Sequence, residues 1–98
     1  MQRLPDRVDL YVADQVLEQI VAADQQAHGD RVYDLSGCER FDSSLLALLF
    51  ELMRRAAADG VRCRFEGASP NMLKLASLYG TRALLFGPAA GRAAGAAA

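Results

Sequence analysis

The sequence predicts a single α/β domain, in which a small, mostly parallel β-sheet of about three or four strands packs against three to four helices. Segments with strand-like and helix-like periodicity alternate along the 98 residues, which favours right-handed crossovers between parallel strands. Residues 61–66 alternate strictly between apolar and polar side chains, as a strand with one buried face does. Residues 45–53 carry seven large apolar side chains in nine positions, which indicates a central buried helix.

The N-terminal segment predicts a short strand and then a helix. Residues 1–4 can form a partial strand, which Pro5 confines to a sheet edge because proline lacks a backbone N–H. Asp9 is a candidate cap for a helix over residues 10–27. Apolar side chains recur along it at every fourth position, at Val12, Val16 and Ile20. Gly29 fits the position that follows a helix C-terminus.

The middle of the chain predicts a strand, a loop and the central helix. Residues 31–35 are rich in β-branched and aromatic side chains, which favours a strand. The loop over residues 36–40 follows its carboxyl end, where open α/β sheets tend to place their sites. We expect the central helix to run from Ser43 to Asp59 and to stop at Gly60.

A third strand and a further helix follow. The expected buried face of the strand consists of Val61, Cys63 and Phe65, with Arg62 and Arg64 facing solvent. Ser69 and Pro70 are a cap and a first helical residue, and Gly80 ends the helix that they open. Its apolar side chains are Met72, Leu75, Ala76 and Tyr79.

The C-terminal segment and the composition set the limits of the domain. Residues 83–86 predict a final strand or turn, so residues 1–87 form the domain. Residues 88–98 are an Ala/Gly-rich tail with nothing large to bury, and we expect it to be disordered. The net charge of −1 gives no general attraction to nucleic acid or to an anionic membrane. No apolar run approaches the ~18–20 residues of a membrane span.

The titratable residues do not form a recognisable catalytic or metal set. His28 is the only histidine, and Cys38 and Cys63 have neither CxxC nor disulfide-framework spacing. Asp34 and Asp42 bracket the loop but have no histidine near them in sequence. Neither GxxxxGK nor GxGxxG occurs. We therefore expect no enzyme activity, no cofactor and no metal.

The start of the central helix is the candidate site. Three short polar side chains precede the leucines, and Asp42 or Ser43 is expected to cap the helix. A second apolar stripe near Leu46 and Phe50 is either buried or docked by a partner. The candidate partner-binding or phosphorylation site consists of Asp42, Ser43, Ser44, Leu45 and Leu46.

These segments resemble STAS domains. Residues 33–36 (YDLS) and 40–44 (RFDSS) are similar to the strand–loop–helix signature of that family, whose loop usually reads D-S/T-S/T/A-G. Residues 73–80 (LKLASLYG) resemble the last helix of the MlaB branch, the small subunit of the Mla phospholipid-transport system. The resemblance covers residues 4–86 and departs at Leu45, where the family commonly has glycine. It implies the STAS-like (SpoIIAA-like) fold.

The resemblance implies a non-enzymatic function, with two alternatives. Likeness to MlaB implies that Ser43 lies at the contact with an ABC ATPase. It also implies a cytoplasmic subunit that joins the inner-membrane transporter through that ATPase. The transporter in that system helps to maintain outer-membrane lipid asymmetry. By likeness to anti-sigma-factor antagonists, a kinase phosphorylates Ser43 or Ser44. A small-ligand or lipid carrier is third, because the sequence shows no apolar cavity signature. STAS domains usually begin with more strand, so the abbreviated N-terminus predicts an open sheet edge and self-association.

Overall fold

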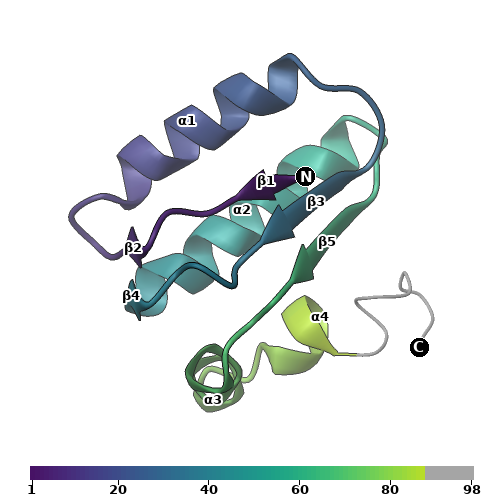
Figure 1. Cartoon of the computed structure of the whole chain (residues 1–98). Coiled ribbons are helices and arrows are strands. Elements are labelled where there is room, and N and C mark those ends of the chain that lie inside the picture. The colour runs from purple at the N-terminus through teal and green to yellow at the C-terminus, as the bar shows by residue number, and fades with distance from the viewer. Residues whose placement is uncertain (88–98) are drawn as a thin grey trace.

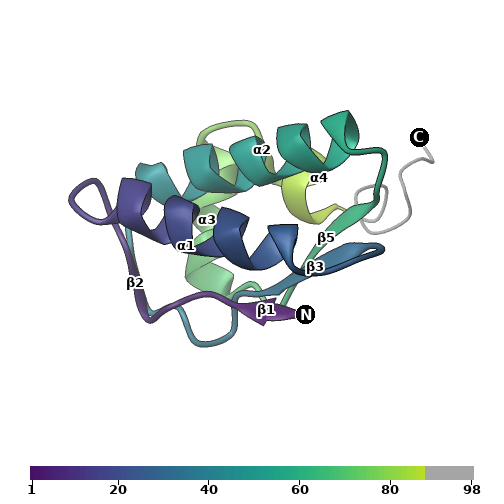
Figure 2. The same cartoon turned by 90° about the horizontal axis from the view of Figure 1, so that it is seen from above.

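The computed structural model describes residues 1–87, and a three-stranded parallel sheet lies at its centre. β1 (Gln2–Arg3), β3 (Arg31–Asp34) and β5 (Cys63–Glu66) are arranged in the order β1–β3–β5. The helices α1 (Ala13–Gln25) and α2 (Ser43–Ala58) connect these strands. Both lie on the same face of the sheet (Figures 1 and 2). The predicted α/β class, with a small parallel sheet, is confirmed.

A second, smaller parallel ladder joins β2 (Arg7–Val8) to β4 (Arg40–Phe41). The sequence did not predict it, because two residues are too few to show an alternating pattern. The described chain therefore has five short strands instead of three or four. The ladder holds the chain before α1 against the chain before α2, since Asp42 N donates to Val8 O at 3.4 Å.

Helix α1 begins three residues later than predicted. Val12 occupies the N-cap position without a side-chain hydrogen bond. Asp9 instead organises the preceding turn: its Oδ1 accepts from Tyr11 N at 3.0 Å, and its backbone oxygen accepts from Ala13 N at 2.9 Å. The prediction of Asp9 as the helix cap is therefore wrong by one turn. Gly29 does adopt a positive φ of 85°, but in the loop beyond the C-cap at Gln26.

Helix α2 forms the predicted centre of the core. Its last helical residue is Ala58, Asp59 is the C-cap, and Gly60 follows with a φ of +72°, so its predicted limits are confirmed to within one residue. Leu45, Leu49 and Leu52 are each at most 1% exposed. Full burial of one such side chain stabilises the fold by about 1.5–3 kcal/mol.

The strand β5 has its predicted orientation but less burial than expected. Val61 is half-buried and lies before the strand, which begins two residues later than predicted. Arg62 and Arg64 are exposed, while Cys63 and Phe65 pack against the core and remain partly exposed. The reason is that β5 is an edge strand of the sheet, so neighbouring structure covers it on one side only.

The helix α3 (Pro70–Leu78) begins as predicted, because Ser69 Oγ accepts from Met72 N at 3.2 Å and Pro70 occupies the first turn. The predicted final strand or turn over residues 83–86 is wrong, since Arg82–Phe86 forms the helix α4. Alanine and leucine are strong helix formers, and this segment has no β-branched residue. One helical turn also buries Leu85 to 2% exposure. The predicted tail, residues 88–98, lies outside the described residues.

One buried carboxylate ties the N-terminal strand to α1. Asp24 is 8% exposed and accepts hydrogen bonds from Tyr33 Oη at 2.6 Å and Gln2 Nε2 at 2.7 Å. Gln2 Nε2 also donates to Ile20 O at 3.0 Å. Burial, followed by the hydrogen bond to Asp24, raises the pKa of Tyr33 well above its usual value. This network fixes β1 at the sheet edge despite its length of two residues.

Candidate functional site

The candidate site is the exposed start of α2, and Asp42 organises it. Asp42 is the N-cap residue, and its Oδ1 accepts from Ser44 N at 2.8 Å. Its other oxygen, Oδ2, accepts from Leu10 N at 3.0 Å. One carboxylate therefore caps the helix and fastens the β2–α1 turn beside it. The prediction that Asp42 or Ser43 caps the helix is confirmed for Asp42.

The charge of Asp42 is fixed by these contacts. Burial raises the pKa of Asp42, but the hydrogen bonds from Ser44 and Leu10 outweigh it and leave the pKa below its usual value. The carboxylate is consequently ionised at neutral pH. A negative charge at this position is favourable, because the helix dipole places partial positive charge at the N-terminus.

The two serines differ in accessibility. Ser43 is exposed at the first position of the helix, and its hydroxyl forms no hydrogen bond with another residue in 1–87. Ser44 is half-buried, and its backbone N–H is used by the cap. The Ser43 hydroxyl is therefore the free polar group at the tip, open to a partner or to a modifying enzyme.

The two leucines that the sequence placed in the site lie beneath its surface. Leu45 is 0% and Leu46 4% exposed, so both belong to the core that supports the tip. Phe50 is half-buried and packs against the same core. Of the two readings of the second stripe, the structure favours burial. The surface that remains for a partner at this helix start is Asp42 and Ser43.

The other candidate residues are not arranged for catalysis. Asp34 lies in its own turn, where a hydrogen bond from Ser36 N, at 2.9 Å, lowers its pKa. Asp34 and Asp42 are therefore both ionised at neutral pH, and neither can act as a general acid there. His28 is exposed in the loop that follows α1, beyond the C-cap Gln26. Within residues 1–87, no group of three or more His, Cys, Asp or Glu side chains is arranged to hold a metal ion.

The thiols are also poorly suited to reaction. Cys38, in the loop over residues 36–40, is only 2% exposed, and burial raises its pKa to about 11. Burial likewise raises the pKa of the half-buried Cys63 to about 11. Thiols are reactive as thiolates, so neither cysteine has the depressed pKa of a redox site.

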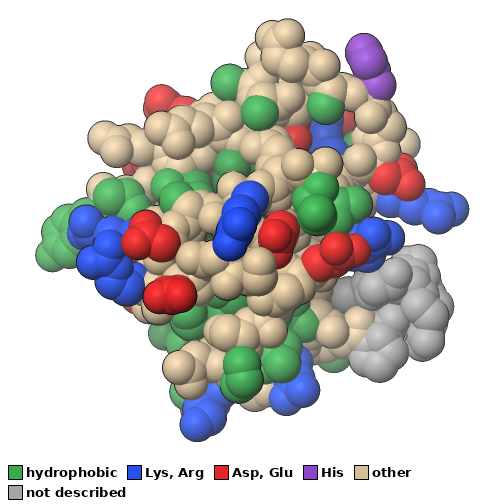
Figure 3. Space-filling view, in the orientation of Figure 1, with side chains coloured by type: hydrophobic (Ala, Val, Ile, Leu, Met, Phe, Trp, Pro, Cys, Tyr) green, Lys and Arg blue, Asp and Glu red, His purple; other side chains and the backbone are tan. Residues whose placement is uncertain are grey.

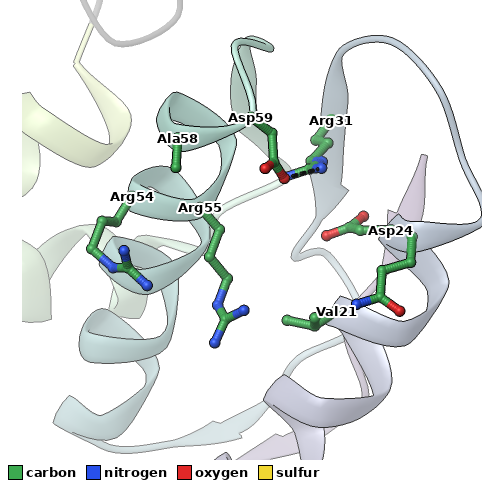
Figure 4. A pocket seen from close by; sticks show the side chains of 8 residues that line it. Val21, Asp24, Arg31, Arg54, Arg55, Ala58 and Asp59 are labelled. Atoms are coloured by element: carbon green, nitrogen blue, oxygen red, sulfur yellow. Dashed lines mark hydrogen bonds and ion pairs between the residues drawn. The ribbon is translucent and has the colours of Figure 1, made fainter.

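A cleft of about 290 Å³ lies between the C-terminal ends of α1 and α2 (Figure 4). Three arginines line it, Arg31, Arg54 and Arg55. Each already has a carboxylate: Asp59 accepts from Arg31 at 2.7 Å, and Glu51 accepts from the other two at 2.6 and 2.8 Å. Asp24 and Asp59 are the two carboxylates of the lining, and Glu51 lies outside it. With Glu51 counted through its ion pairs, three carboxylates balance the three guanidiniums, so this region has no excess positive charge with which to attract an anion.

Comparison with known proteins identifies the family. The family model described as "Mlab, STAS domain" matches residues 3–86. The chain belongs to the STAS-domain family. The comparison with curated proteins and the comparison with solved structures found no match. The match spans every strand and helix of this STAS domain except the first residue of β1, and it confirms the resemblance to MlaB. Within its described residues, none of the helices has the length and apolar character needed to cross a membrane.

The sequence did not single out two exposed side chains beside the STAS-domain tip. Leu10 and Tyr11 are 71% and 83% exposed, and Leu10 N donates to Asp42. The helix was expected to begin at Leu10, which would have made both residues part of α1. One feature of the sequence did indicate their exposure: neither Leu10 nor Tyr11 falls on the apolar helix face that contains the buried Val16 and Ile20.

Proposed function

We propose that this STAS domain is a non-enzymatic subunit that binds and supports the ATPase of an ABC-type phospholipid transporter. Its place would be the cytoplasmic side of the inner membrane, in a system that maintains outer-membrane lipid asymmetry. The observation that carries the proposal is the exposed Ser43 hydroxyl, held beside the capping carboxylate Asp42 at the start of a helix whose leucines are buried in the core. The description of the matching family model, which names Mlab, supports the same partner class.

The physical character of the tip suits recognition. A capped helix start above a close-packed core keeps its shape when a partner arrives, so little conformational entropy is lost on binding. Asp42 and Ser43 offer a fixed charge and a hydroxyl, whereas catalysis would need a base with a pKa near neutrality. The ionised carboxylates and buried thiols described above do not supply one.

A second candidate function rests on the accessibility of the same hydroxyl. A kinase could reach Ser43, as in an anti-sigma-factor antagonist that is switched by phosphorylation. Phosphate would add about −1.5 to −2 charges at the helix start, where the dipole accepts negative charge but a bound partner surface would be repelled. This function and the transporter function predict different partners for the unmodified protein.

A binding experiment separates the two functions. The purified unmodified protein is mixed with the candidate ABC ATPase and, separately, with a candidate serine kinase and ATP. We expect a stable complex with the ATPase, which Ser43→Ala retains. Ser43→Asp should weaken it, because a larger, hydrated carboxylate replaces a small hydroxyl at the contact and must lose its water there. Mass spectrometry detects any phosphate on Ser43 or Ser44. Phosphate addition combined with no ATPase complex would replace the transporter function by the switch.

A further inference from the structure

Two large apolar side chains stand in solvent next to the proposed site. Leu10 and Tyr11 occupy the turn between β2 and α1 and are 71% and 83% exposed. A single exposed apolar residue is ordinary, but adjacent exposed residues of this size beside a polar tip are typical of an interaction surface. Tyrosine in particular is enriched among the residues that dominate binding energy at protein interfaces.

The backbone of this turn is held in place. Tyr11 N donates to Asp9 Oδ1 at 3.0 Å, and Leu10 N donates to Asp42 Oδ2 at 3.0 Å. Arg7 Nε in turn pairs with Asp9 Oδ2 at 2.6 Å. Both exposed side chains therefore project from an ordered backbone, which lowers the entropy lost when a partner covers them.

The turn and the tip form one surface. The bond between Leu10 and Asp42 joins residues 32 positions apart in sequence. The turn before α1 and the start of α2 lie at the same end of the molecule in both ribbon views (Figures 1 and 2). A partner that contacts Ser43 at this end meets Leu10 and Tyr11 beside it.

The charge of this end indicates the chemistry of its partner. Residues 6–14 and 39–43 contain five carboxylates and two guanidiniums, which gives a net charge of −3, whereas the whole chain has −1. Figure 3 shows hydrophobic, basic and acidic side chains close together at the end that carries β2 and β4. The complementary surface is therefore a basic one that surrounds an apolar pocket.

We propose that Leu10 and Tyr11 form the apolar anchor of a protein-binding surface that continues through Asp42 to Ser43. Its occupant is a protein with an apolar pocket rimmed by Lys and Arg. This inference rests on the proposed function, under which that protein is the ATPase subunit. The anchor provides affinity, and the acidic surroundings provide orientation and faster association.

The chain offers a matched control for the test. Tyr79 and Leu84 are another exposed tyrosine and leucine, 59% and 60% exposed, at the C-cap of α3 and within α4. The double variants Leu10→Ser/Tyr11→Ser and Tyr79→Ser/Leu84→Ser are titrated against the purified ATPase. Thermal unfolding of both variants checks that they are folded. The backbone N–H groups of the turn survive the change, so its hydrogen bonds remain available.

We expect the Leu10/Tyr11 variant to raise Kd at least tenfold and the control variant to change it less than twofold. The wild-type Kd should also rise between 50 and 300 mM salt, because the attraction is partly electrostatic. The anchor is refuted, and the proposed function stands, if wild type binds and Ser43→Asp weakens binding but the Leu10/Tyr11 variant binds like wild type. If wild type does not bind the ATPase, the proposed function fails and the anchor fails with it.

Discussion

Asp42 makes two separate contacts, and a pair of substitutions separates them. Asp42→Ala removes both acceptors, so Ser44 N and Leu10 N lose their partner. Asp42→Asn keeps an oxygen for the helix cap, because asparagine caps about as well as aspartate. The amide group of asparagine has no second oxygen, and the contact with Leu10 is lost.

The expected effects follow from these contacts. Loss of an N-cap destabilises a protein by about 1 kcal/mol, within a range of 0.5–2. The Leu10 contact is exposed, and water can replace its acceptor, so we assign it about 0.5–1 kcal/mol. Asp42→Ala should therefore lower the free energy of unfolding by about 1–3 kcal/mol and Asp42→Asn by about 0.5–1. In a domain of this size, 1 kcal/mol corresponds to roughly 4–8 °C in Tm.

Two measurements check this prediction. Urea unfolding at pH 7 gives the stability of each variant, with an unchanged m-value as the sign that the unfolded state is the same. Amide hydrogen exchange follows the two N–H groups separately. Leu10 should exchange faster in both variants, and Ser44 only in Asp42→Ala. An Asp42→Ala variant within 0.5 kcal/mol of wild type, or an unchanged Leu10 exchange rate, would refute the assignment.

Three further predictions concern the fold. Gly67→Ala should lower the free energy of unfolding, measured in urea, by about 1–3 kcal/mol more than Gly60→Ala, because it overpacks its site. Both glycines have φ above +70°, but only at Gly67 would a Cβ lie 2.9 Å from Asp34 Oδ1. Equal losses of stability in the two variants would contradict this. The hydrogen bond with Arg54 lowers the pKa of Glu51 to about 2, so the contribution of Glu51 to stability is lost as pH falls from about 4.5 to 2. Glu51→Gln should therefore flatten that part of the curve of stability against pH. Parallel curves for wild type and Glu51→Gln would exclude this contribution. The two-residue β1 leaves an open sheet edge, so sedimentation at high concentration should detect self-association; a strict monomer would count against it.

The long, strongly patterned elements could be predicted from the sequence. Helix α2 and the start of α3 were predicted at their observed limits, because the apolar run above Gly60 and the Ser69–Pro70 pair are local signals. The ladder between β2 and β4 could not be predicted, since its stability comes from contacts between segments more than 30 residues apart. The helix α4 was misread because four apolar residues fit a buried strand and a buried helical turn equally well.

The candidate site divides in the same way. The polar tip was visible as Asp42, Ser43 and Ser44 ahead of the leucines, because capping is a short-range pattern. The neighbouring apolar pair was not visible, since Leu10 comes beside Asp42 only through a tertiary hydrogen bond. The same bond delays α1, because the segment before Ala13 is used as a turn instead of a first helical turn.

The most direct test of the central claim is a calorimetric titration of the purified protein with the ABC ATPase. Ser43→Asp is compared with His28→Asp, which adds the same charge at an exposed position beyond the far end of α1. We predict that wild type and His28→Asp bind with Kd values within twofold of each other. We predict that Ser43→Asp binds at least tenfold more weakly while its thermal unfolding is unchanged. Absence of wild-type binding, or an equal effect of the two substitutions, would contradict the claim that this STAS domain binds the ATPase through the start of α2.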